Sequence, residues 1–156
     1  MSKIEVWKPI VNYEGLYEVS SYGNVRSLDR YMFSKRWNKD QLVKGRDLKP
    51  SMAKNGYLRI ELTDKDGNRK KHPVHRLVAM AFIHNINNYT QINHIDEDKA
   101  NNAVSNLEWC TSKYNINYGT WKDRHCKQIA QYDLNGTLIA TYNSLSDAAK
   151  VGFSAS

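Results

Sequence analysis

A histidine and several short amide side chains are grouped in one part of this chain. His94 directly follows Asn93, and Asn106 and Asn115 come 12 and 21 residues after His94. A neutral imidazole can take a proton from water near physiological pH, and amide oxygens can bind a hard divalent cation. These residues could therefore support metal-dependent hydrolysis. A plainer interpretation stays open, because residues 85–117 contain nine asparagines and asparagine is common in turns.

The segments around these residues predict how they would be positioned. Residues 91–96 and 107–111 are typical of two short strands, joined by a polar loop. Thr111 or Ser112 can cap a helix that begins at Lys113 and ends near Gly119. This order places His94 near the end of a strand and Asn115 on the first turn of the following helix.

The rest of the chain predicts an α+β protein built from small antiparallel sheets and short helices. Polar and apolar residues alternate over 57–63, residues 64–68 favour a turn, and residues 69–74 return as a second strand. Weaker hairpins are expected over 16–28 and 129–142, and helices over 75–83 and 147–151, the latter capped from Ser144. The stretch 31–50 has no clean period and many charges, and we expect a solvated loop or linker there.

The basic residues are concentrated in the middle of the chain. The formal net charge is +7, and residues 35–76 alone carry 13 basic and 5 acidic side chains, which gives that segment a net charge of +8. A basic segment between nearly neutral ends indicates a polyanionic partner such as nucleic acid. A two-stranded ribbon with an outer face of Lys and Arg would fit the major groove of DNA, although such a face can also merely keep a protein in solution.

Composition also excludes several classes of protein. A chain of 156 residues is too short for a large multidomain enzyme. No apolar stretch is long enough to cross a membrane and no signal peptide is visible, so we expect a cytoplasmic protein. Cys110 and Cys126 do not form the paired pattern of a zinc ribbon, and we expect both to be free thiols.

The chain resembles the HNH homing endonucleases of phage and intron type, which carry modular DNA-binding segments. The resemblance covers nearly the whole chain and depends on the following segments: 7–10, 13–20, 23–27, 74–79, 93–96, 101–102, 106–109, Asn115 and 129–152.

The resemblance implies a ββα-metal finger with a defined set of functional residues. His94 would be the general base, Asn93 and Asn115 would bind one Mg²⁺ or Mn²⁺ ion, and Asn106 would brace the loop that orients His94. Many relatives have Asp at the position of Asn93, and a neutral amide binds a cation less strongly than a carboxylate does. The residues that we expect to contact double-stranded DNA are Arg26, Lys54, Tyr57, Arg59, Arg69, Lys70, Lys71 and Arg76.

The resemblance also implies a domain order and a function. We expect an N-terminal nuclease-associated module over 1–50, the basic hairpin and nuclease core over 51–120, and over 121–156 a truncated intron-nuclease repeat that binds DNA. The implied function is site-specific hydrolysis of DNA phosphodiester bonds in a bacterial or phage-infected cell. With one catalytic motif, a monomer would nick one strand.

Two other functions remain as alternatives. The first is a sequence-specific DNA-binding protein, derived from such a nuclease, that has lost cleavage because Asn93 fails as a ligand. The second is an RNA-binding or ribosome-associated basic protein, which would explain the net charge but not the ordered group of His94 and its asparagines.

Overall fold

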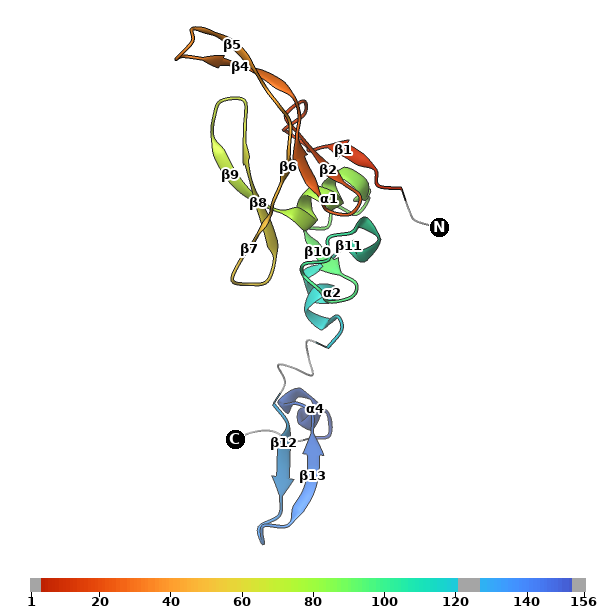
Figure 1. Cartoon of the computed structure of the whole chain (residues 1–156). Coiled ribbons are helices and arrows are strands. Elements are labelled where there is room, and N and C mark those ends of the chain that lie inside the picture. The colour runs from red at the N-terminus through yellow and green to blue at the C-terminus, as the bar shows by residue number, and fades with distance from the viewer. Residues whose placement is uncertain (1–3, 121–126, 153–156) are drawn as a thin grey trace. The chain divides into compact units, whose positions relative to one another are not determined.

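The computed structural model describes residues 4–120 and 127–152, and it divides into two compact units, Met1–Asn115 and Ile116–Ser156 (Figure 1). Small antiparallel sheets with few helices confirm the predicted α+β class. Within the described residues, no helix is long and apolar enough to cross a membrane. Cys110 is buried and free, whereas Cys126 lies outside the described residues.

The N-terminal sheet forms where the sequence predicted a hairpin. Its strands are ordered β1-β2-β3-β6, and each pair of neighbours is antiparallel. The bounds are β1 Trp7–Pro9, β2 Tyr17–Ser20, β3 Val25–Ser27 and β6 Asp47–Leu48. The turn between β2 and β3 contains Gly23 at φ +86°, a left-handed conformation that glycine adopts without strain.

The prediction of a loop over residues 31–50 was wrong. A hairpin formed by β4 (Arg30–Ser34) and β5 (Lys39–Val43) occupies this stretch, and β6 follows it. The two strands pair only with each other within the described chain, and no residue of either strand is buried. Without a buried face, no alternation of polar and apolar residues is required. The strand was not predicted because its consecutive exposed apolar residues, Tyr31, Met32 and Phe33, do not alternate with polar residues.

The predicted basic hairpin is confirmed, and a short third strand extends it to a sheet of three strands. They are β7 (Ser51–Met52), β8 (Leu58–Thr63) and β9 (Arg69–Pro73), and β8 lies between the other two. Ile60 and Leu62 of β8 are buried, 4% and 0% exposed, on the face that the alternation assigned to the core.

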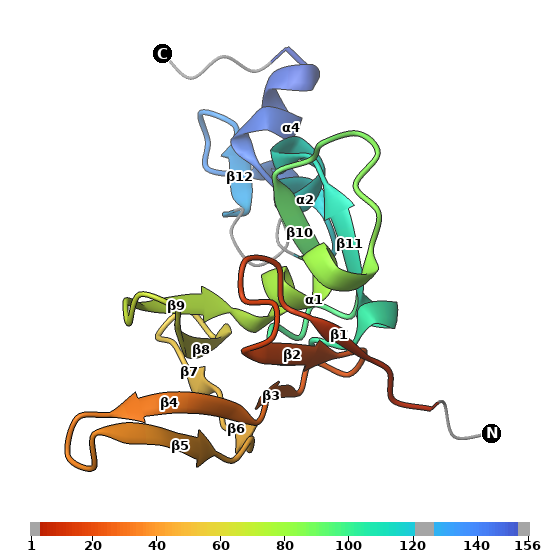
Figure 2. The same ribbon diagram turned by 90° about the horizontal axis from the view of Figure 1, so that it is seen from above.

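The core joins this sheet to a helix and to the hairpin that carries His94 (Figure 2). Helix α1 (Val74–Phe82) buries Val74, Leu77 and Val78, whose spacing of three and four residues lines one helix face. The predicted strands around His94 are β10 (Gln91–His94) and β11 (Leu107–Cys110), and the short 3-10 helix η1 (Val104–Asn106) directly precedes β11. Helix α2 (Ser112–Asn117) follows β11, as expected.

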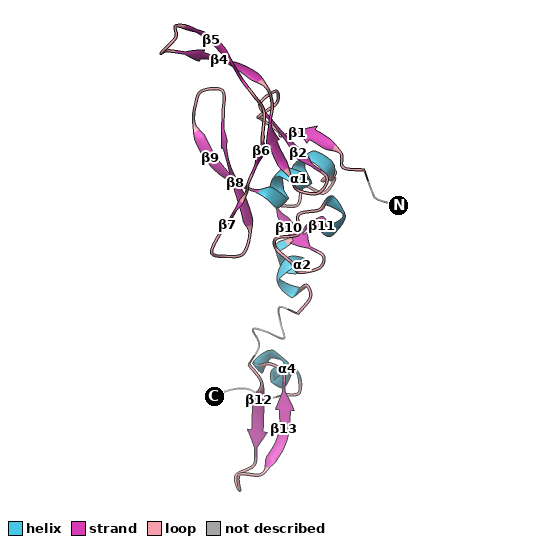
Figure 3. Ribbon diagram, viewed as in Figure 1, coloured by secondary structure: helices cyan, strands magenta, loops and turns pink. Residues whose placement is uncertain are grey.

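The second unit is a hairpin with one helix. Strands β12 (Ile129–Tyr132) and β13 (Leu138–Tyr142) are antiparallel, and α4 (Leu145–Lys150) follows them (Figure 3). The predicted cap is present, because Asp147 N–H donates to Ser144 Oγ at 3.1 Å.

Gly23 offers a test of how the N-terminal sheet supports the rest of the first unit. A Cβ at Gly23 would lie 2.8 Å from Asn102 Cβ, whereas a Cβ at Gly67, with nearly the same φ, would meet nothing within 4 Å. We expect Gly67→Ala to cost about 1–2 kcal/mol through backbone strain alone. Gly23→Ala should cost more, because the loop that contains Asn102 must also move. Urea unfolding of both variants measures this difference, and equal losses of stability would contradict the packing argument.

Candidate active site

The antiparallel pairing of β10 with β11 sets the position of Asn93 and His94. In this register Asn93 lies opposite Glu108 and His94 lies opposite Leu107. Both side chains are buried, 6% and 5% exposed, although both are polar. Buried polar groups need partners, and the partners of these two define the site.

His94 is held by one amide and two rings. Its Nε2 lies 3.3 Å from Asn102 Oδ1, and Asn102 is itself anchored by a bond from Nδ2 to the Ala100 carbonyl. The His75 ring packs edge-on against His94 with centroids 5.2 Å apart, and the Tyr57 ring lies 5.8 Å from His94 and 4.9 Å from His75. Three segments that are distant in sequence therefore meet at this imidazole.

The surroundings keep the histidines neutral. Burial lowers the pKa of His94 below 6.5, although the bond to Asn102 and the negative charges of Asp96 and Asp98 oppose this effect. The pKa of His75 is lowered to about 4, because the ring is buried and lies near His94, Arg76 and Arg59. At neutral pH both rings are therefore uncharged.

The Asn106 side chain braces the loop between the two strands. Its Oδ1 accepts from the Asp96 amide at 3.0 Å, and its Nδ2 donates to Asp96 Oδ1 at 2.8 Å and to the Asn101 carbonyl at 2.9 Å. Asn101 Nδ2 adds a bond to the second Asp96 oxygen. These bonds hold the pKa of Asp96 below its usual range.

The residues expected to bind a metal offer oxygen atoms. Asn93 Nδ2 donates to Glu108 Oε1 at 2.8 Å, which orients the amide and leaves Oδ1 as the atom suited to a cation. Asn115 lies on α2, which begins at the second residue after β11, and within the described residues it takes no part in the side-chain hydrogen bonds of Asn93 and His94. No three His, Cys, Asp or Glu side chains of the described residues are grouped to hold a metal. Such an amide donor set fits Mg²⁺ or Mn²⁺ better than zinc.

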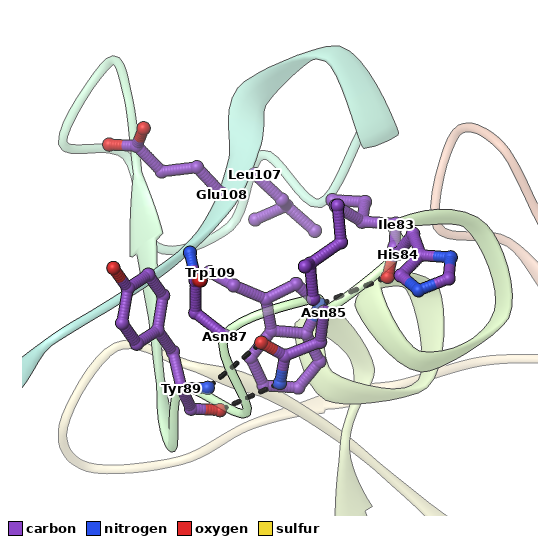
Figure 4. A pocket seen from close by; sticks show the side chains of 9 residues that line it. Ile83, His84, Asn85, Asn87, Tyr89, Leu107, Glu108 and Trp109 are labelled. Carbon is purple, nitrogen blue, oxygen red and sulfur yellow. Dashed lines mark hydrogen bonds between the residues drawn. The ribbon is translucent and has the colours of Figure 1, made fainter.

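Glu108 also lines an open pocket of about 280 Å³, and His94 is not among the lining residues of this pocket (Figure 4). Its wall is the segment 83–89, which is held by two bonds between Asn85 and the backbone of Tyr89 and by Trp109 Nε1 donating to the Ile83 carbonyl. These bonds stabilise the connection between α1 and β10.

The structure distributes the predicted DNA-binding residues over several environments. Alternation along β9 places Lys71, opposite Glu61, on the outer face, whereas Lys70, opposite Leu62, lies on the other face. Lys54 is exposed in the turn between β7 and β8, and Arg69 is exposed 3.8 Å from Glu61.

Two of these arginines already have partners within the chain. Arg26 forms an ion pair with Glu18 at 2.7 Å and lies over the Trp7 ring. Arg76 donates to the Thr90 carbonyl and lies near the Trp109 ring. Their predicted contact with DNA would require them to share or exchange these partners.

The structure brings residues to the site that the sequence analysis did not assign to it. Asn102 contacts His94 directly, and Glu108 orients Asn93. Tyr57, predicted to touch DNA, and His75 pack against His94. The sequence gave two weak indications of these positions. Alternation along β8 puts Tyr57 on the polar face, and His75 stands at the start of a helix.

Comparisons with known proteins match three segments of the chain. Residues 5–63 match the NUMOD4 motif, residues 72–116 match an HNH endonuclease, and residues 127–151 match the NUMOD1 domain. The predicted boundaries of 1–50, 51–120 and 121–156 stay a prediction.

Two curated relatives illustrate the similarity. An uncharacterized HNH endonuclease, L245, of Acanthamoeba polyphaga mimivirus is 41% identical over 124 residues, which are 78% of this chain and 35% of that protein. The DNA endonuclease I-HmuI of Bacillus phage SP01 is 36% identical over 129 residues, 80% of this chain and 66% of the phage protein. The chain thus spans less than two thirds of the length of these relatives.

A solved structure is also similar. Its description reads "DNA binding and cleavage by the HNH homing endonuclease I-HmuI". The two structures align with a TM-score of 0.57 at 30% sequence identity, and the alignment covers 94% of this chain and 83% of the I-HmuI chain.

His75 makes the stability of the chain depend on pH. Between pH 6.5 and about 4 the unfolded chain binds a proton at His75 that the folded chain does not bind. The contribution of neutral His75 to the free energy of unfolding should therefore have its full value above pH 6.5. It should decrease on acidification, by at most about 1.4 kcal/mol per pH unit. Urea unfolding across this range should show a shallower dependence for His75→Gln, with a remainder from His72 and His94, whose pKa values are also lowered. Identical slopes for variant and wild type would refute the assignment.

Proposed function

The chain belongs to the HNH homing endonuclease family, and from this premise we propose that it is a site-specific endonuclease that hydrolyses phosphodiester bonds in double-stranded DNA. The observation that carries the proposal is the buried, neutral His94 held by Asn102 next to the amide of Asn93. A histidine without a chemical task gains little from burial, because its polar ring must be desolvated.

His94 would act as the general base. Asn102 Oδ1 can only accept a hydrogen bond, so the contact with His94 Nε2 requires the proton to be on Nε2. The lone pair of Nδ1 is then the basic site, and it would take a proton from the water that attacks phosphorus. Asn106 would keep this geometry by bracing the loop from which Asn102 extends.

Asn93 and Asn115 would hold one divalent cation, Mg²⁺ or Mn²⁺, together with a phosphate oxygen of the DNA. When bound, the ion would neutralise the charge that develops on the leaving 3′ oxygen. Because Glu108 orients the Asn93 amide, it supports this role of a neutral ligand in a position where many relatives have Asp.

The outer face of the basic hairpin would bind the DNA backbone. Arg59, Arg69 and Lys71 lie on this face, with Lys54 at one of its turns. The remaining candidates, Arg26, Tyr57, Lys70 and Arg76, would contribute secondary contacts. With one His94 per chain, a monomer would nick one strand, in the cytoplasm of a bacterium or phage-infected cell.

A second candidate function is sequence-specific DNA binding without cleavage. The observation in its favour is Asn93, which is a weaker ligand than a carboxylate. Cleavage and binding must therefore be measured separately.

Removal of the general base should abolish cleavage. We expect the wild type to convert supercoiled plasmid that carries target DNA into open circles with Mg²⁺ or Mn²⁺, and to lose this activity with EDTA. His94→Ala should cut at least about 100-fold more slowly. DNA affinity, measured by electrophoretic mobility shift, should stay within severalfold.

His84→Ala is the matched control, because His84 is exposed and takes no part in the ring contacts among Tyr57, His75 and His94. If the wild type binds its target but never cuts it, the cleavage-deficient alternative is correct. If His94→Ala loses DNA binding as well, His94 has a structural role.

Two adjacent lysines can show which face of the hairpin meets DNA. Removing one lysine that neutralises a phosphate should reduce the slope of log affinity against log salt by about 0.9. We expect Lys71→Gln, on the outer face, to produce this change and Lys70→Gln, on the opposite face, to produce a smaller one. Equilibrium binding at several salt concentrations gives both slopes. Unchanged slopes for both variants would mean that DNA binds to another surface of the protein.

A further inference from the structure

Two buried side-chain atoms in the described residues have no hydrogen-bond partner. They are Nε of Arg59 and Nδ1 of His75. A buried polar atom without a partner destabilises the fold by about 1–3 kcal/mol, so such atoms are rare and need an explanation. That both occur in one part of the molecule points to a common cause.

The two atoms belong to neighbouring side chains, of which His75 packs against His94. Arg59 follows Tyr57 by two residues, on the same face of the sheet, and pairs across the strands with Pro73, two residues before His75. The Tyr57 ring touches the His75 ring, and His75 packs on His94. The charge of Arg59 also lowers the pKa of His75, which shows that the two are within electrostatic range.

Among the residues that the structure describes, Arg59 has no acidic partner. The ion pairs among the described residues use Arg26, Lys44, Arg69 and Lys150, and none of them includes Arg59. A partly buried guanidinium without a carboxylate retains its full attraction for an anion. The chemical group that satisfies a guanidinium N–H and an imidazole N–H together is an anionic oxygen.

We propose that Arg59 Nε and His75 Nδ1 together bind a non-bridging oxygen of the DNA phosphate that lies beside His94. This inference rests on the proposed function and deepens it, since it assigns the group that fixes the phosphodiester relative to the general base. In this arrangement His75 is neutral with its proton on Nδ1, so both contacts are donated by the protein. Arg59 supplies a positive charge, and the N–H of His75, whose ring is held by Tyr57 and His94, fixes the orientation of the phosphate oxygen.

The arrangement also explains why His75 is kept neutral and why Tyr57 is present. A protonated His75 would place a second positive charge beside His94 and weaken it as a base. Tyr57 packs against both imidazoles, and Lys99 lies over the Tyr57 ring 5.0 Å from its centre. The site for the phosphate oxygen is thus bounded by residues of the hairpin, of α1 and of the loop before η1.

The first test needs no cleavage. The full chain, with ¹⁵N-labelled histidine, is titrated with a short DNA duplex in EDTA, and binding is checked by mobility shift. We expect the His75 Nδ1 resonance to shift on binding in the wild type and to shift much less in Arg59→Gln, while the exposed His84 reports any general effect. If the duplex binds and the His75 resonance does not move, the proposal is wrong, and water fills the site instead.

The second test measures single-turnover cleavage at saturating DNA. Arg59→Gln and His75→Gln should each reduce the rate about 100-fold, the effect of removing one donor from a preorganised oxyanion site. His75→Asn should recover part of the loss, because its amide N–H can replace Nδ1–H, and Lys65→Gln, in the exposed turn after β8, is the control for lost charge. Rates of folded Arg59→Gln and His75→Gln within about threefold of the wild type would overturn the proposal. A wild type that never cuts would overturn the proposed function instead, and the resonance of His75 would still decide whether a phosphate binds there.

Discussion

The hydrogen bonds of the Asn106 side chain are the constraint on which the site depends. They join the start of the loop after β10, at Asp96, to its far end, at Asn101. The Asn106 carbonyl adds a fourth bond, from the Ile95 amide. Closing the loop at these points brings Asn102 back to His94, which lies eight residues earlier. A single short amide thus converts a flexible polar loop into a rigid support for an imidazole, as preorganised catalysis requires.

The N-terminal sheet extends this support. The Val104 amide donates to the Ser21 carbonyl at 2.9 Å, and the turn at Gly23 packs against Asn102 so closely that a side chain there would collide with it. The basic hairpin adds Tyr57, whose ring packs against His75 and His94. Segments of the chain that match separate motifs therefore share one site, and the position of His94 depends on the packing between them as much as on its own hairpin.

How much of this the sequence could predict depends on the physical origin of each feature. The hairpins over 16–28 and 57–74 were found because burial of one face leaves a period in the sequence. The hairpin over 30–43 was missed because it buries neither face fully. The contact between Asn102 and His94 left no period at all, since it arises from the closure of an irregular loop. The roles of Asn93, His94, Asn106 and Asn115 were inferred from family resemblance and stay proposals.

The distribution of charge connects DNA binding to the chemistry. Burial is the main reason why the pKa values of both imidazoles are lowered, and at His75 the charges of Arg76 and Arg59 add to this effect. At His94 the lowering by Lys99 is smaller than the opposing effects of Asp96 and Asp98. A phosphate that binds beside His94, as proposed, would bring negative charge, raise the pKa of the imidazole and make it a stronger base. The neighbouring cations limit this change, because they share the field of the phosphate. Burial thus keeps the proposed base neutral, while the surrounding basic residues would recruit the DNA.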